Sequence, residues 1–442
     1  MANFAKPDGP RFSVDVYQNE YLPEGGSQVD AIVTVTATGG GTLGGGAVAP
    51  GRPSAAVAVM VDCSGSMDYP PAKMRGAREA TAAAIDTLRD GTRFAVIGGT
   101  HVAQEVYPGG GRLAVADATT REQAKQALRR LSAGGGTAIG TWLRLADRLL
   151  SAADVTLRHG ILLTDGRNEH ESPADLRATL DACAGRFTCD ARGVGTDWDV
   201  KEVTGIASAL LGTADIVADP AGLAADFTRM METAMGKEVA DVALRVWTPL
   251  GATLRFVKQV APAVEDLTHR RTEAGPRAGD YPTGSWGDES RDYHLSVTVP
   301  PAGLGQEMLA ARVSLVVPQP DGTVQNLGAQ GLVRAVWTDD MAASTAMSPQ
   351  VAHYTGQAEL AQAIQQGIDL RKAGDFDGAT AKLGRAVQLA NASGNADTAK
   401  LLAKVVDVVD AATGTVRLKT RVTEADEMTL ETRSTKTVRV KK

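Results

Sequence analysis

The stretch VAVMVDCSGSM at residues 57–67 changes from apolar to polar at Asp62. The apolar run VAVMV predicts a β-strand that is buried on both faces. Directly after it, Asp62, Ser64 and Ser66 bring one carboxylate and two hydroxyls to a turn. Gly65 lets the backbone bend at this point. Such a cluster is typical of a nucleophile, a phosphate-binding loop or a metal site, and the rest of the chain discriminates among these.

The sequence around this stretch alternates apolar runs with amphipathic segments. The apolar runs predict buried strands, and the segments between them have the apolar spacing of helices. Strands and helices that alternate in this way predict a doubly wound, Rossmann-like α/β domain with a largely parallel sheet, which we expect over residues 53–236. The predicted strands are 55–61, 94–98, 160–164 and 214–218, and the predicted helices are 73–89, 119–131, 138–151 and 172–183.

Residues 237–340 show a different pattern, in which apolar and polar residues alternate between loops that contain Gly and Pro. This pattern predicts an antiparallel β-sandwich. Within it, the polar and glycine-rich residues 266–292 are expected to form an exposed loop. The strands predicted in residues 1–50 have no partners in the α/β region. We therefore expect them to complete the sandwich, with the α/β domain inserted into it.

Residues 350–414 return to a helical pattern. Leu360, Ile364 and Ile368 follow one another at intervals of four, and each helical segment ends near a glycine. We expect a small helical module there. Residues 415–442 lack helical periodicity and are rich in threonine, so we expect a loose or strand-like tail.

The composition argues against several classes of partner. A formal net charge of −6 and an aromatic content of 4% argue against nucleic-acid binding. The chain has no apolar run of about 18 residues that could span a membrane, and its N-terminus lacks the apolar segment of a signal peptide. Cys63, Cys183 and Cys189 form no C-x-x-C pair, which is typical of reduced thiols. We expect a cytoplasmic protein with no membrane or nucleic-acid partner.

Two further loops carry oxygen side chains that match the opening cluster. Thr137 ends a glycine-rich turn that opens a predicted helix, and Asp165 lies just past another buried strand. Asp62, Ser64 and Ser66 follow the first parallel strand, at the sheet edge where open α/β sheets bind ligands. Compact, hard oxygen donors from three loops predict a site for Mg²⁺ or Mn²⁺ rather than for zinc.

These residues give the pattern D-x-S-x-S, then Thr, then Asp. In this pattern the chain resembles the von Willebrand factor A family, whose metal-ion-dependent adhesion site has the same order. The resemblance implies that Ser64, Ser66 and Thr137 ligate Mg²⁺, or Mn²⁺ or Ca²⁺, directly. It implies that Asp62 and Asp165 act directly or through water.

The same resemblance implies what the protein does. It points to a non-catalytic bacterial scaffold that binds an Asp or Glu of a protein partner through the metal. An adaptor for an ATPase is one form that such a scaffold takes in this family.

Two enzymatic interpretations compete with adhesion. A metal-dependent phosphohydrolase of the haloacid-dehalogenase type needs D-x-D, because the second Asp protonates the leaving group, but Ser64 stands at that position. A serine hydrolase needs G-x-S-x-G and a histidine partner, and the residues around Ser64 do not match that pattern.

The C-terminal segment suggests a second hypothesis for function. The segment looks like a substrate for a Ser/Thr kinase, and phosphothreonine there would offer a charged ligand to an Arg-bearing phospho-reader. The protein would then be an adaptor that is regulated by phosphorylation. The candidate hydroxyls are Thr420, Thr423, Thr429, Thr432, Ser434, Thr435 and Thr437.

Overall fold

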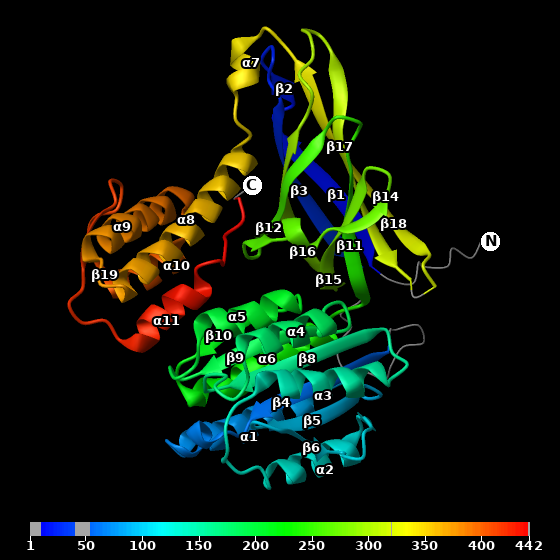
Figure 1. The fold of residues 1–442 in the computed structure, drawn as a ribbon, viewed down its shortest axis with the longest axis vertical. Coiled ribbons are helices and arrows are strands. Elements are labelled where there is room, and N and C mark those ends of the chain that lie inside the picture. The colour runs from blue at the N-terminus through cyan, green and yellow to red at the C-terminus, as the bar shows by residue number, and fades with distance from the viewer. Residues whose placement is uncertain (1–9, 40–53, 320, 441–442) are drawn as a thin grey trace. The chain divides into compact units, whose positions relative to one another are not determined.

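The computed structural model describes residues 10–39, 54–319 and 321–440, so the predicted segments 1–50 and 415–442 lie partly outside it. The chain forms two compact units (Figure 1). None of the helices in this described part has the length and apolar composition needed to cross a membrane. The first unit holds Pro10, the described residues of Gly40–Ala240 and Gly284–Gly287, and the second holds Arg11–Gly39, Asp241–Thr283 and the described residues after Gly287.

A seven-stranded sheet forms the centre of the first unit. The strands β10, β9, β8, β4 and β5 are parallel and lie side by side in that order, whereas β6 and β7 run antiparallel to β5. This arrangement confirms the predicted doubly wound α/β fold. The strands are β4 (Ala55–Asp62), β5 (Arg93–Gly99), β6 (Ala103–Tyr107), β7 (Ala114–Val115), β8 (Leu157–Thr164), β9 (Thr188–Val194) and β10 (Ala214–Val217).

Helices pack against this sheet through apolar side chains. Val57 and Val59 of β4 belong to one core cluster with Met74 of α1 and Phe227 of α6. Trp142 of α3 is fully buried, and it lies so close to β5 that a Cβ atom at Gly99 would approach its ring to 2.2 Å. The helices are α1 (Ala72–Thr87), α2 (Ala118–Leu128), α3 (Ile139–Ser151), α4 (Pro173–Cys183), α5 (Val200–Ala209) and α6 (Leu223–Met235).

The strand β9 escaped sequence analysis because two charged residues interrupt its apolar pattern. Asp190 and Arg192 are both buried, and each has a partner. Nε2 of His159 lies 3.1 Å from Asp190, and Nε of Arg192 donates to Asp226 at 2.7 Å. Buried charges are tolerated in a strand when they are paired in this way.

The second unit contains a five-stranded sheet in the order β1-β3-β16-β12-β13. Its strands come from distant parts of the chain: β3 pairs antiparallel with β16 from Gln28 opposite Thr298 to Ala37 opposite Glu289. The N-terminal strands β1 and β3 therefore share a sheet with strands that follow the α/β region. The strands are β1 (Arg11–Gln18), β3 (Gln28–Thr38), β12 (Thr253–Ala261), β13 (Glu265–Asp266) and β16 (Glu289–Thr298).

A six-stranded sheet, in the order β14-β15-β11-β17-β18-β2, packs against the first sheet. A Cβ atom at Gly331 of β18 would lie 2.7 Å from Val16 and 2.8 Å from Val14 of β1, so a glycine is needed there. The two sheets confirm the predicted antiparallel β architecture, to which β2 adds one short parallel pair. The strands are β2 (Tyr21–Leu22), β11 (Val239–Trp247), β14 (Thr272–Gly275), β15 (Ala278–Trp286), β17 (Glu307–Pro318) and β18 (Val324–Trp337).

The prediction of an exposed loop at 266–292 is wrong. This segment contains β14, β15 and the first residues of β16, and Trp286 is fully buried. Its glycines hide the strand pattern because they leave room for neighbouring side chains. A Cβ atom at Gly279, for example, would lie only 2.4 Å from Nε of Arg271.

Helices follow the sandwich in the second unit. Leu360, Ile364 and Ile368 of α8 pack with Leu383 and Leu402 in one apolar cluster, as their spacing predicts. The elements are α7 (Met341–Thr345), α8 (Pro349–Lys372), α9 (Phe376–Ser393), α10 (Ala396–Val405), β19 (Val406–Asp410), β20 (Thr415–Leu418) and α11 (Glu424–Arg433).

Two expectations for this region are corrected. Residues Val406–Asp410 form a strand rather than part of a helix, and they pair with β20 in a two-stranded sheet. The prediction of a loose or strand-like tail is wrong for its centre, because α11 is a helix in which Leu430 is fully buried. After α11 the backbone returns to the sandwich, where Val264 N donates to Thr435 O at 2.8 Å.

Candidate metal site

Asp62 is the last residue of β4, and its buried carboxylate ties the neighbouring loops together. Oδ1 accepts the backbone N–H of Ser64 at 2.7 Å. Oδ2 accepts the hydroxyl of Thr164 at 2.7 Å and the backbone N–H of Asp165 at 3.3 Å. Burial raises the pKa of Asp62 to about 6, and the charge of Asp165 adds to the rise. The folding of these loops thus concentrates negative charge at the edge of the sheet.

Two serine hydroxyls connect the loop after β4 with the loop after β8. The hydroxyls of Ser64 and Ser66 lie 2.9 Å apart. Ser66 then donates to Oδ1 of Asp165 at 2.6 Å. Because β4 and β8 are neighbouring parallel strands, their carboxyl ends bring these side chains to one place.

Thr137 reaches the same place from the glycine-rich turn before α3. Backbone hydrogen bonds hold this turn against the loop after β4: Gly65 N donates to Gly135 O at 2.9 Å, and Gly134 N donates to Cys63 O at 2.8 Å. His170 fixes the threonine itself. The ring Nδ1 of His170 accepts the backbone N–H of Thr137 at 3.2 Å. The backbone N–H of His170 donates to Thr137 O at 2.9 Å.

Three hydroxyls converge on the space beside Gly166. A Cβ atom built there would lie 3.1 Å from Oγ of Ser66, 3.5 Å from Oγ1 of Thr137 and 3.8 Å from Oγ of Ser64. The structure thus brings together the residues that the sequence singled out. No group of three or more His, Cys, Asp or Glu residues in the described chain could hold a metal, so a metal at this point depends on hydroxyl donors. Hydroxyls and carboxylates fit a hard divalent cation.

Lys73 and Asp197 complete the surroundings of Asp165, and sequence analysis missed both. Nζ of Lys73 donates to Oδ2 of Asp165 at 2.8 Å and to Oδ2 of Asp197 at 3.0 Å. Burial lowers the pKa of Lys73, but the hydrogen bonds to the two carboxylates outweigh this effect and raise it. Lys73 lies in the first turn of a predicted helix, where a lysine is normally solvated, so the sequence carried no signal for it.

A second group of polar residues fixes the N-terminus of α3 next to Thr137. The side chains of Asn168 and Glu171 accept the N–H groups of Ile139 and Gly140, each at 2.8 Å. Glu202 accepts the N–H of Asn168 at 3.2 Å. Burial raises the pKa of Glu202 to about 7, and the charges of Asp199 and Glu171 contribute. These contacts hold Thr137 on a rigid support.

The site lacks the features of a nucleophile. The hydroxyls of Ser64 and Ser66 bond to each other and to Asp165, and His170 contacts only the backbone of Thr137 among the site residues. Burial raises the pKa of the Cys63 thiol to about 12, so its thiolate is scarce. Ser64 also leaves the site without the second aspartate that a phosphohydrolase would use.

Two family models match the chain: von Willebrand factor type A domain over residues 55–216, and von Willebrand factor type A C-terminal domain over residues 388–434. The chain is 50% identical to a solved structure described as von Willebrand factor type A from Catenulispora acidiphila, with a TM-score of 0.92 and coverage of 100% of this chain and 99% of the other. The chain belongs to the von Willebrand factor type A family.

A second solved structure, the ArnB paralog VWA2 from Sulfolobus acidocaldarius, shares the fold of this type A protein. The TM-score is 0.58 at 14% identity, and the match covers 96% of this chain and 98% of the other. No curated protein matches the sequence.

The type A C-terminal model covers the segment from the last turns of α9 to the end of α11. The threonine-rich segment is therefore largely part of a folded family domain. Several of its hydroxyls have partners: Thr432 donates to Met428 O at 2.7 Å, and Thr437 donates to Val260 O at 2.6 Å. Ser434 is buried and donates to Glu431 O at 2.8 Å. These contacts oppose phosphorylation of Thr432, Ser434 and Thr437 in the folded protein.

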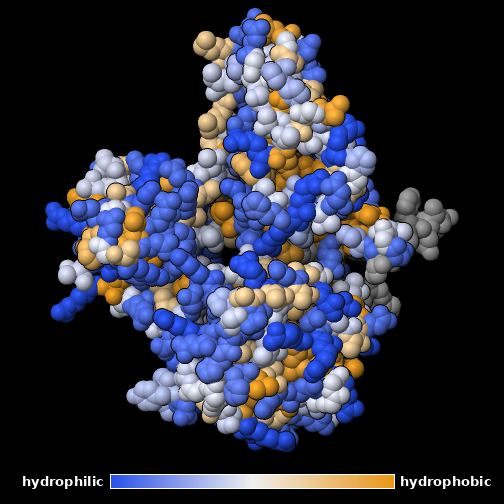
Figure 2. All heavy atoms as spheres, in the orientation of Figure 1, coloured by the Kyte–Doolittle hydropathy of each residue, from blue (hydrophilic) through white to orange (hydrophobic). Residues whose placement is uncertain are grey.

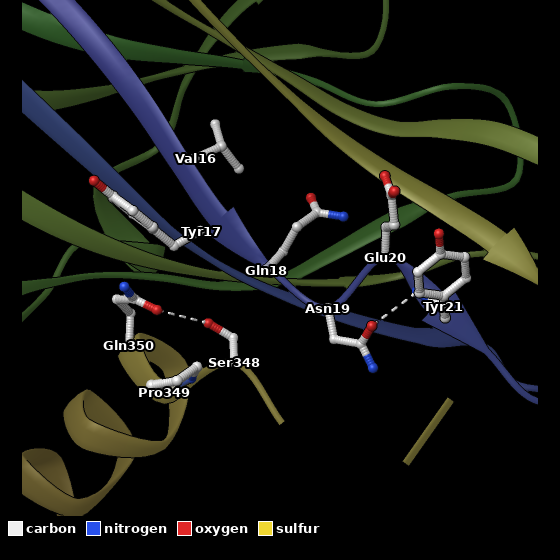
Figure 3. A pocket seen from close by; sticks show the side chains of 9 residues that line it. All are labelled: Val16, Tyr17, Gln18, Asn19, Glu20, Tyr21, Ser348, Pro349 and Gln350. Atoms are coloured by element: carbon white, nitrogen blue, oxygen red, sulfur yellow. Dashed lines mark hydrogen bonds between the residues drawn. The ribbon is translucent and has the colours of Figure 1, made fainter. Parts of the chain in front are cut away.

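A cavity of about 430 Å³ lies elsewhere in this type A protein, between the end of β1 and the start of α8 (Figure 3). It is lined by residues 16–21 and 348–350, among which Glu20 is the one charged side chain. Asn19 is turned to the backbone and donates to Ala343 O at 2.9 Å. Figure 2 shows hydrophobic atoms over nearby α7, where Met341 is 77% exposed. The cavity holds no cluster of reactive or metal-binding groups.

Proposed function

We propose that this protein is a non-catalytic interaction protein that binds a divalent cation and, through it, an acidic residue of a protein partner. The convergence of three hydroxyls beside Gly166 is the observation that carries the proposal. Mg²⁺ is the first candidate, with Mn²⁺ or Ca²⁺ as alternatives. The ligands would be Asp62, Ser64, Ser66, Thr137 and Asp165.

The charge of this ligand set favours capture of a carboxylate. Ser64, Ser66 and Thr137 are neutral donors, so they leave the charge of a cation largely uncompensated. When bound, the cation supplies a hard Lewis acid that attracts an Asp or Glu side chain. Asp62 and Asp165 also accept hydrogen bonds from the loops, from Ser66 and from Lys73, so each would bind the cation directly or through water.

Exposure supports access from one side. Asp62 and Asp165 are fully buried, whereas Ser66 is exposed. Tyr69, three residues further along the same loop, is 82% exposed. A partner that offers a carboxylate at Ser66 would therefore find an apolar surface at Tyr69.

Metal binding is the first test of the proposal. We expect one Mn²⁺ to bind the wild-type protein in calorimetry or electron paramagnetic resonance, and no Mn²⁺ to bind Asp165→Ala or Ser66→Ala. Circular dichroism should show that both variants remain folded. Absence of Mn²⁺ binding by the wild-type protein, or equal binding by the variants, would refute the proposal.

Partner binding is the second test. Affinity capture compares three samples: the wild type with Mg²⁺, the wild type with EDTA, and Asp165→Ala with Mg²⁺. We expect one protein that only the first sample retains. Replacement of each exposed Asp or Glu of that protein by Asn or Gln should then identify one acidic residue on which capture depends. A partner that binds equally in EDTA would contradict metal-bridged capture. An ATPase as partner and a cytoplasmic, bacterial setting stay predictions of the sequence.

A further inference from the structure

Lys73 is a buried lysine whose ammonium group lies between two carboxylates. Its side chain is 7% exposed, and Asp165, its partner at 2.8 Å, is fully buried. Asp197, its partner at 3.0 Å, is 67% exposed and lies in the loop between β9 and α5. The first turn of α1 therefore places a full positive charge directly behind the proposed metal site.

The two oxygens of Asp165 face different partners. Oδ1 accepts the hydroxyl of Ser66, on the side where the three hydroxyls converge. Oδ2 accepts Nζ of Lys73. Lys73 therefore does not contact Oδ1, the oxygen that faces the site. It can keep its hydrogen bond to Oδ2 when a cation is bound.

We propose that Lys73 is an internal counter-cation that lowers the affinity of the site for metal and raises the affinity of the loaded site for a partner's carboxylate. This inference rests on the proposed function of the same site.

The argument is one of charge. Asp62, Asp165 and Asp197 are carboxylates around the site, and Lys73 offsets part of their negative charge. Lys73 adds one positive charge beside Asp165, so the loaded site is more positive with Lys73 than it would be without it. That charge repels the incoming cation but attracts an anionic side chain. In the metal-free protein the same ammonium stabilises the buried Asp165, which would otherwise be an unpaired buried charge.

The test compares three variants. Lys73→Met keeps the aliphatic stem and removes the charge, whereas Lys73→Arg keeps the charge. Lys125→Met is the matched control: it removes a charge that is paired with Asp86, near the other end of α1. Asp86 lies 13 residues after Lys73, which is about 20 Å along the helix.

Mn²⁺ binding is measured first. We expect Lys73→Met to bind Mn²⁺ about tenfold more tightly than the wild-type protein, and Lys73→Arg and Lys125→Met to bind it as the wild type does. Thermal unfolding should show a larger stabilisation by Mg²⁺ in Lys73→Met, because the metal-free variant loses the partner of Asp165.

Acetate is then titrated into each Mn²⁺-loaded protein, and water-proton relaxation reports the displacement of water from the metal. We expect Lys73→Met to need several times more acetate than the wild type for half-saturation. Equal or weaker Mn²⁺ binding by Lys73→Met, or equal acetate binding, would overturn the assignment of Lys73 while leaving the metal site in place. Failure of the wild-type protein to bind Mn²⁺ would overturn the proposed function and this inference together.

Discussion

The hydroxyl of Ser66 donates a 2.6 Å hydrogen bond to Asp165, which lies 99 residues further along the chain. The bond joins the loops that follow β4 and β8. Because these strands are parallel neighbours, their carboxyl ends place the two loops at one edge of the sheet. The candidate site is thus a consequence of strand order, and substitutions that disturb the meeting point of its loops should affect metal binding before they affect the fold.

Gly166→Ala tests that meeting point directly. The added methyl group would lie 3.1 Å from Oγ of Ser66 and 3.5 Å from Oγ1 of Thr137, in the space on which the hydroxyls converge. We expect Mn²⁺ affinity to fall by at least tenfold, measured by calorimetry, while circular dichroism stays unchanged. Gly205→Ala in α5 is the control, because nothing lies within 4 Å of its added methyl group. Undiminished Mn²⁺ binding by Gly166→Ala would place the metal elsewhere.

Tyr354→Phe tests a buried contact between α8 and the sandwich. The hydroxyl of Tyr354 donates to Oδ2 of the buried Asp292. Without the tyrosine hydroxyl, Oδ2 of Asp292 is left with the more distant contact with Nε of Arg439, at 3.4 Å. We expect the free energy of unfolding in urea to fall by about 1–3 kcal/mol. The exposed Tyr69→Phe should change it by less than about 0.5 kcal/mol, and an equal effect of both substitutions would argue against the contact.

Glu202 predicts a dependence of stability on pH. Its pKa is raised from 4.5 to about 7 in the folded protein, so the folded state binds more protons than the unfolded state between these values. The contribution of Glu202 to stability is therefore present below about pH 4.5 and is lost as the pH rises through about 7. Between pH 5 and pH 8 we expect the wild type to lose stability relative to Glu202→Gln. Urea unfolding at each pH should show the free energy of unfolding of the variant rising relative to that of the wild type. A difference between the two proteins that is constant with pH would contradict this.

Thr432→Glu tests whether the C-terminal segment tolerates a negative charge. Thr432 is 5% exposed and donates to Met428 O, so a carboxylate there would be buried without a partner. We expect the free energy of unfolding to fall by about 2 kcal/mol or more. The exposed Thr420→Glu should leave it nearly unchanged. Normal stability of Thr432→Glu would revive the hypothesis of regulation by phosphorylation at this residue.

Sequence analysis predicted the features that depend on local pattern. Four of the parallel strands contain the short, largely apolar runs that predicted them, and α3 begins within one residue of its predicted start. The five oxygen side chains of the candidate site were found because each directly follows a predicted strand or opens a predicted helix. The order of parallel strands then dictates that they meet.

The features that sequence analysis missed depend on contacts between distant residues. The strand β9 contains charged residues whose partners, His159 and Asp226, lie far away in the sequence. The helix α11 has few apolar residues, and Leu430 among them packs in the cluster formed by the other C-terminal helices. Lys73 gains its role only because Asp165 and Asp197 fold against it. No local pattern reports such contacts.

The helix α8 belongs to two cores. Near its start, Tyr354 packs with Ile32 and Val260 of the sandwich, and further along Ile364 packs with the C-terminal helices. Its 24 residues extend over about 36 Å, so one rigid rod connects both clusters. Loss of α8 together with the helices that follow it would remove Tyr354 and leave Ile32 and Val260 of the sandwich uncovered. A boundary drawn between the sandwich and these helices would therefore expose apolar surface on both sides of the cut.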